Sequence, residues 1–284
     1  METRRIIART QKQAMDWSLV LASQGIEPII LHEENNWELR VGETDYENAR
    51  AAIRQYRREN RGWNFQQNIR GLLFHWGSLF WVIALWLFYY WSEIRFPSAK
   101  ILGLMDNRGI FSGEWWRIFT AMTLHGDITH ALANATTGFL LLGLAMARYG
   151  FGWALLASYI AGAGGNFLGA IFYSEIHRSL GASGMVTGAL GLLATQLFFE
   201  WRKNHWRRRI IIRSLAGGIL ILVLIGFGEN ADLVAHLGGF FFGSLLGCLL
   251  NSLPSRFSEN LLSNQLALFL LGIWIALTWG LALR

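Results

Sequence analysis

A serine, two histidines and an asparagine are the residues of this sequence whose types could together perform acyl transfer. Ser183 lies in "GASG", a Gly-x-Ser-Gly pattern that presents many serine nucleophiles on a tight turn at the start of a helix. A serine hydroxyl needs a base to take its proton, and His236 is the candidate. The tetrahedral intermediate needs hydrogen-bond donors, which His130, Asn134 and the Ser183 backbone N–H could supply.

Each of these residues also has a purely structural interpretation. A serine such as Ser183 is common where membrane helices pack closely, and His236 could hydrogen-bond a neighbouring helix. His130 and Asn134 could satisfy backbone groups where a loop enters the bilayer. Asp232, four residues before His236, invites the construction of a triad, but we expect it to cap the start of a helix instead.

The elements that must position these residues are expected to be membrane-spanning helices. The chain has 284 residues, is 53% hydrophobic and is only 15% charged, well below the roughly 25% of soluble domains. It contains seven apolar segments of about the length needed to cross a bilayer, roughly 20 residues. They cover residues 72–91, 128–147, 151–172, 183–201, 210–227, 231–250 and 265–283. The composition therefore predicts an all-α polytopic membrane protein.

The arginines and lysines indicate how this protein lies in the membrane. Basic clusters precede the first segment and separate the fourth from the fifth, which places both clusters on the cytoplasmic side. This orientation accounts for the pI of 9.8, so no nucleic-acid partner is expected. The second, fourth and sixth segments then all run from the outer face inward. Their first turns carry the four polar residues at one depth, which favours a single site near the outer face.

The first 62 residues are polar and are predicted to form a separate small domain. Their pattern indicates an α-β-β-α unit on the cytoplasmic side, and residues 63–284 form the transmembrane domain. We see no catalytic constellation in the small domain. The N-terminal "METRRIIART" lacks an apolar core, so a cleavable signal peptide is not expected.

Three sequence stretches, in this order, resemble the rhomboid intramembrane serine proteases. They are "EWWRIFTAMTLHGDITHALAN", "GASGMVTGALG" and "AHLGGFFFG", and the resemblance covers about residues 70–250. It implies a rhomboid-like six-helix core with a Ser-His dyad, in which Ser183 is the nucleophile and His236 the base. His130 and Asn134 match the residues on the oxyanion side. The seventh segment lies beyond this core, an arrangement also found in the family.

The resemblance extends to supporting residues. Gly181 matches the glycine two positions before the nucleophile, and Asn166 in "GGNFLGA" looks like a Gly-Asn motif of the third helix. Trp116 and Arg117 match a Trp-Arg pair in the first external loop, which is half-embedded in the membrane.

The sixth segment also carries a stripe of small residues. Gly239 and Gly243 belong to a four-residue repeat that begins at Ala235 and ends at Gly247. We predict that this stripe packs against Gly184 and the glycines that follow it in the fourth segment, because small residues let helix backbones approach closely. The distance between the two helices would then set the distance from the serine to the histidine.

The predicted function is that of an intramembrane serine endopeptidase. Its partners would be membrane proteins with a transmembrane segment, cut within the lipid bilayer near the outer interface, without a metal or another cofactor. Such a protein would lie in a bacterial inner membrane, with its N-terminus in the cytoplasm and its active site open to the outer face. Two alternatives are a non-catalytic rhomboid-like protein that binds transmembrane helices and a small transporter with discontinuous helices.

Overall fold

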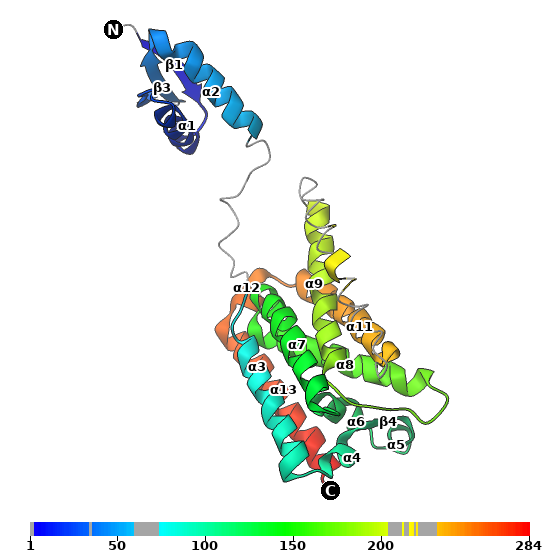
Figure 1. Cartoon of the computed structure of the whole chain (residues 1–284). Coiled ribbons are helices and arrows are strands. Elements are labelled where there is room, and N and C mark those ends of the chain that lie inside the picture. Colours follow the sequence, from blue (N-terminus) through cyan, green and yellow to red (C-terminus); the bar gives the residue numbers. More distant parts are fainter. Residues whose placement is uncertain are drawn as a thin grey trace. The chain divides into compact units, whose positions relative to one another are not determined.

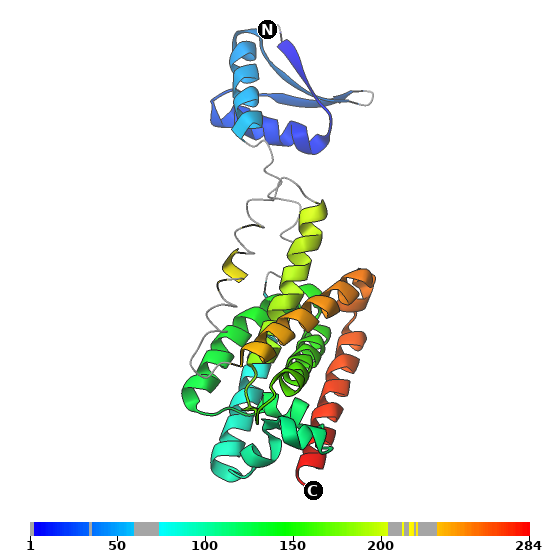
Figure 2. The same cartoon turned by 90° about the vertical axis from the view of Figure 1, so that its right-hand side faces the viewer.

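The computed structural model describes residues 3–33, 36–59, 74–203, 212, 216–218, 220 and 232–284. The chain divides into two compact units, Met1–Gln67 and Asn68–Arg284, and both can be followed in Figures 1 and 2. The domain boundary predicted at residue 62 lies among residues 60–73, outside the described ranges.

The first unit is a three-stranded antiparallel sheet with two helices. Its strands have the order β1-β3-β2. In chain order the elements are β1 (Thr3–Ala8), α1 (Gln11–Ser23), β2 (Ile29–Glu33), β3 (Asn36–Gly42) and α2 (Tyr46–Glu59). The predicted α-β-β-α order is therefore wrong in one respect, because it omits β1.

The omission of β1 has a physical cause. This strand lies at the edge of the sheet, where it pairs with β3 from Thr3↔Gly42 to Ala8↔Trp37. Its arginines are exposed, and only Ile6 and Ala8 contact the core. Two inward apolar residues are too few to produce the alternation by which a strand is recognised in a sequence.

Both helices of this unit cover the same face of the sheet. Leu39 and Val41 of β3 point to one face because they are two residues apart, and they share a core with Trp17 and Leu21 of α1 and with Ile53 of α2. Four further buried residues complete this core, and six partly buried residues line it: Ala8, Ala14, Ile26 and Ala49, and Ile6, Ile30, Trp37, Tyr46, Ala52 and Tyr56.

The second unit is helical, and six of the seven predicted spans fall on helices in it. These helices are α3 (Ser78–Tyr90), α7 (Ile128–Tyr149), α8 (Phe151–Phe172), α9 (Ser183–Lys203), α11 (Leu233–Ser252) and α13 (Leu261–Ala282). A short helix, α12 (Ser255–Glu259), joins α11 to α13. The predicted fifth span, residues 210–227, lies almost entirely outside the described residues.

Four of these helices, α7, α8, α11 and α13, are long and apolar enough to cross a membrane. The apolar part of α9 is shorter, Ser183–Phe199, and α3 continues into a π-helical turn, Trp91–Arg95. The predicted all-α polytopic membrane fold with a small α+β N-terminal region is confirmed.

The segment between α3 and α7 is not a simple loop. It contains α4 (Ala99–Gly103), β4 (Met105–Asp106), α5 (Asn107–Phe111), α6 (Arg117–Thr120) and a 3-10 turn, Ala121–Thr123. The two residues of β4 pair with β5 (Arg178–Ser179), which precedes α9. This pairing joins the segment to the turn that leads to Ser183.

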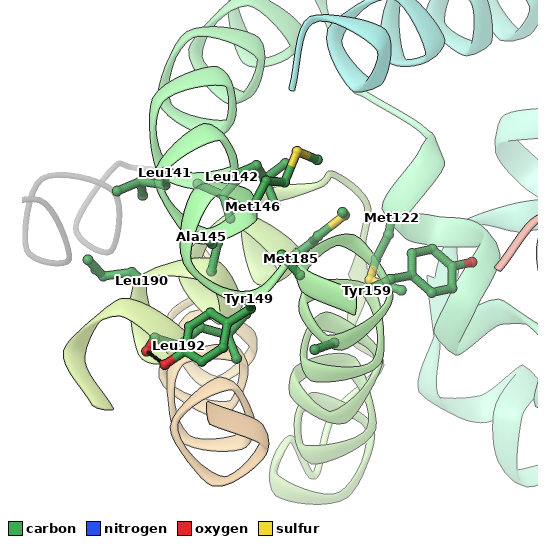
Figure 3. Packing of buried hydrophobic residues seen from close by; sticks show 14 of the residues in the cluster. Met122, Leu141, Leu142, Ala145, Met146, Tyr149, Tyr159, Met185, Leu190 and Leu192 are labelled. Atoms are coloured by element: carbon green, nitrogen blue, oxygen red, sulfur yellow. Dashed lines mark hydrogen bonds between the residues drawn. The ribbon is translucent and has the colours of Figure 1, made fainter. Parts of the chain in front are cut away.

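The largest buried apolar cluster lies where α7, α8 and α9 meet (Figure 3). Leu142 and Tyr149 of α7 are buried there with Tyr159 of α8 and Leu192 of α9. Figure 3 also shows Met185, on the first turn of α9, at the same cluster. The start of α9 is thus part of the core of this unit.

Candidate active site

Three helices, α7, α9 and α11, bring four of the predicted site residues together near their N-terminal ends: His130, Asn134, Ser183 and His236. The contact between α9 and α11 is made backbone to backbone. A Cβ added at Gly239 would meet the carbonyl oxygen of Gly184, and one added at Gly243 would meet that of Gly188. The predicted stripe of small residues therefore does join these two helices, and its spacing leaves no room for a side chain.

This close approach places a serine beside a histidine. The Ser183 hydroxyl lies 2.7 Å from Nε2 of His236, a hydrogen-bond distance. His236 is almost completely buried, with 3% of its surface exposed, while Ser183 is half-buried. If the hydroxyl donates to Nε2, the imidazole stands ready to take the serine proton.

The nucleophile turn, residues 181–182 directly before Ser183, depends on a glycine and is fixed by two hydrogen bonds. Gly181 has φ +132°, a conformation that L side chains rarely adopt. Its N–H donates to the Ala121 carbonyl at 3.0 Å, and the Ala182 N–H donates to Nε2 of His125 at 3.4 Å. Because α9 begins at Ser183, the first N–H groups of the helix have no partner within it and can receive a negative charge.

His130 and Asn134 face this turn from α7. A Cβ added at Gly181 would lie 2.6 Å from Cε1 of His130 and 3.6 Å from Nδ2 of Asn134. Asn134 is 4% exposed, and its Nδ2 has no hydrogen-bond partner among the described residues. The α7 helix is capped by Asp127, whose carboxylate accepts from the His130 N–H at 2.8 Å. The side-chain amide of Asn134 is thus a buried hydrogen-bond donor that faces the nucleophile turn and has no partner among the described residues.

Asp232 caps α11 and is not a third member of the pair. Its Oδ1 accepts from the Ala235 N–H at 3.0 Å, and its Oδ2 lies 2.7 Å from Nε2 of His177. No described residue bonds to Nδ1 of His236. Burial alone would raise the pKa of Asp232, but the hydrogen bonds from Ala235 and His177 together lower it. The predicted capping role is confirmed, and the arrangement is a pair rather than a triad.

Two histidines near the site were not anticipated from the sequence. His125 is completely buried behind the nucleophile turn, and this burial lowers its pKa to about 3, so its ring is neutral at physiological pH. His177 stacks on Tyr173 with ring centroids 3.8 Å apart and bonds to the cap of α11. His125 is the first residue of "HGDITH", but the sequence does not show which groups its ring contacts, because these come from a distant part of the chain.

Trp116 and Arg117 lie outside the site and organise the segment before α7. Nη1 of Arg117 donates to the carbonyls of Ile101 and Leu104 at 2.9 and 3.0 Å, and Trp116 packs at the edge of an apolar cluster. Asn166 of α8 donates to the Ile118 carbonyl at 2.7 Å. These contacts position α6 and the 3-10 turn that follows it.

The described ranges contain no group of three or more His, Cys, Asp and Glu side chains that could hold a metal ion. The apolar helices and the buried pair define a polytopic integral membrane protein with a serine and a histidine in hydrogen-bond contact. A Rhomboid domain matches residues 112–253, which is half of the chain. The chain belongs to the rhomboid family.

Several proteins are similar to the chain over this region. RHOMBOID-like protein 4 of Arabidopsis thaliana is 35% identical over 54% of this chain and 39% of its own length. Rhomboid protease GluP of Bacillus subtilis (strain 168) is 34% identical over 59% of this chain and 32% of its own length. The putative rhomboid protease YdcA of the same organism is 30% identical over 58% of this chain and 82% of its own length. The chain thus spans half or less of the first curated relatives that it matches.

Proposed function

We propose that this protein is an intramembrane serine endopeptidase that hydrolyses peptide bonds in or near transmembrane segments of membrane proteins. The observation that carries the proposal is the 2.7 Å contact between the Ser183 hydroxyl and Nε2 of His236. Membership of a family whose named members include proteases supports it. The opening of the site to the outer face of a bacterial inner membrane, with residues 1–62 in the cytoplasm, is part of the same proposal.

The chemistry is an acyl transfer in two halves. His236 Nε2 takes the proton as Ser183 Oγ attacks the scissile carbonyl carbon. The oxyanion that forms is stabilised by donors from Asn134, His130 and the Ser183 N–H. When the intermediate collapses, the C–N bond breaks and the imidazolium returns its proton to the leaving amine. Water, deprotonated by the same histidine, then releases the acyl group and regenerates the serine.

The depth of the site limits the substrate. A peptide bond in a helix is shielded because its N–H and C=O are engaged along the helix. Substrates are therefore expected to carry small or helix-breaking residues near the cut, where the substrate helix can unwind at low cost.

The test is labelling and cleavage by the purified protein in proteoliposomes. The wild type should react with a fluorophosphonate at Ser183 and cut a single-span substrate, while Ser183→Ala and His236→Ala should lose cleavage and remain folded. The double variant should be little slower than either single one, because the two groups act as a unit. Ser158→Ala is a matched control, since Ser158 is a buried serine of α8 whose hydroxyl has no partner among the described residues. A wild type that binds transmembrane segments but neither reacts nor cleaves would identify the non-catalytic alternative.

A further inference from the structure

We infer that α13, the helix beyond the six-helix core, positions the nucleophile turn through a hydrogen bond from Trp279 to Thr123. The inference rests on the proposed function, because it concerns the reactivity of Ser183. Trp279 Nε1 donates to the Thr123 hydroxyl at 3.1 Å. Thr123 is the last residue of the 3-10 turn Ala121–Thr123, whose Ala121 carbonyl accepts a hydrogen bond from the nucleophile turn.

The path from Trp279 to the backbone that precedes Ser183 is short and combines hydrogen bonds with the chain of residues 121–125. The Thr123 hydroxyl donates in turn to the Thr120 carbonyl at 2.7 Å. On either side of Thr123, Ala121 accepts the Gly181 N–H and His125 accepts the Ala182 N–H. The residues from 121 to 125, named here the bracing segment, thus hold both backbone groups that precede Ser183.

The side chain of Trp279 is buried and tightly packed. Its ring lies 5.0 Å from that of Trp91, edge to face, and a Cβ added at Gly103 would touch it at 2.6 Å. Only 6% of Trp279 is exposed. Its N–H therefore has a fixed direction, toward the bracing segment. Figures 1 and 2 both place the C-terminal end of α13 beside the segment that contains α4 and α6.

A pocket lies beside this attachment. A partly open pocket of about 460 Å³ lies between α3 and the middle of α13, and its lining is mainly apolar. Thr123, His125 and Ala182 contribute to its wall. On the side facing α13, the bracing segment is joined to this helix by the Trp279 hydrogen bond and by Leu124, which lies in one buried cluster with Trp279 and Ala282.

The other end of α13 is anchored independently. Asn264, 2% exposed, accepts the Gly152 N–H at 2.9 Å and donates to the Ser258 carbonyl at 2.7 Å. Gly152 has no room for a Cβ against the Asn264 backbone. Loss of the Trp279 hydrogen bond should therefore leave α13 packed in place. The effect of losing this bond can then be measured without also losing the helix.

The experiment compares Trp279→Phe, which removes the N–H and keeps an aromatic ring, with the wild type. We expect kcat for a single-span substrate to fall about five- to tenfold with an unchanged KM, the scale of one lost hydrogen bond. The fluorophosphonate labelling rate of Ser183 should fall by the same factor, because it reports the nucleophile without a peptide substrate. Trp274→Phe is the matched control: Trp274 lies on the same helix and contacts Phe119 edge to face, with ring centroids 5.2 Å apart.

Thr123 provides an independent pair of variants. Thr123→Val should reproduce the loss, and Thr123→Ser, which keeps the hydroxyl, should restore most of the rate. Adding Trp279→Phe to Thr123→Val should slow the enzyme no further. Wild-type kcat and labelling in Trp279→Phe, a change in KM alone, or additive effects in the double variant would each overturn the inference. If Trp279→Phe does not fold, the comparison of Thr123→Val with Thr123→Ser tests the inference. A wild type that is itself never labelled would refute the proposed function instead.

Discussion

Replacing Gly239 by valine tests whether the spacing of α9 and α11 controls the reaction. A Cβ at this position would lie 2.6 Å from Oγ1 of Thr187 and closer still to the Gly184 carbonyl oxygen. Because ordinary contacts need about 3.5 Å, the helices must separate by roughly 1 Å. The Ser183–His236 distance of 2.7 Å would then exceed the usual limit for a hydrogen bond.

A misplacement of about 1 Å costs about 100-fold in rate. We therefore expect Gly239→Val to lower kcat at least about 100-fold, with a fall in stability of about 1–3 kcal/mol from overpacking. Gly239→Ala should also be impaired, because its Cβ alone makes the contact. Gly184→Ala should be tolerated, since its Cβ would lie 3.4 Å from the Gly162 Cα, an ordinary contact.

The assay is the cleavage rate in proteoliposomes, measured well below the melting temperature of each variant. The control is Gly272→Val on α13, where an added Cβ would meet nothing within 4 Å. The control should keep the wild-type rate. If Gly239→Val combined a wild-type rate with a wild-type melt, helix spacing would not set the geometry of the pair.

Three further outcomes are expected. Asn134→Ala should lower kcat by about 10²–10³ through the loss of one oxyanion donor; an unchanged kcat would contradict its role. Asp232→Ala should destabilise the protein by about 1 kcal/mol in thermal melts at neutral pH. The folded-state pKa of Asp232 lies below its ordinary value of 3.8. The stability difference between wild type and variant should therefore be complete above pH 3.8 and disappear as the pH falls below it. A stability difference that does not change with pH would show that the charge of Asp232 does not contribute. Removal of residues 1–60 should leave the cleavage rate in detergent largely unchanged, because the site residues all lie in the second unit; a folded but inactive truncation would oppose this.

The Ser183–His236 contact could be predicted because local patterns place both residues at one depth and the resemblance to the rhomboid proteases pairs them as a dyad. Apolar segments of membrane length, together with the positions of arginine, placed the first turns of three helices at one end. The small-residue stripe then fixed which helices approach. Asp232 was predicted as a cap from its position alone, one turn before His236, since capping depends on residues within the same turn.

What the sequence did not reveal depends on contacts between distant residues. The short helices between α3 and α7 have no periodicity that could be recognised. They are held by side chains such as Asn107, whose amide donates to the carbonyl of Glu175, and Arg117, which bonds to two carbonyls. His125 likewise acquires its partner only when this segment meets the start of α9, and His177 acquires its partner only when it meets Asp232 at the start of α11.

Synthesis separates in time the two partners of the hydrogen bond between Thr123 and Trp279. They are 156 residues apart in the chain. At about 5–20 residues per second, Trp279 is made about 8–30 s after Thr123. His236 is also made before Trp279, so a nascent chain holds both members of the serine–histidine pair before α13 is present. If the Trp279 hydrogen bond positions the nucleophile turn as inferred, Ser183 reaches its full reactivity only once α13 is present.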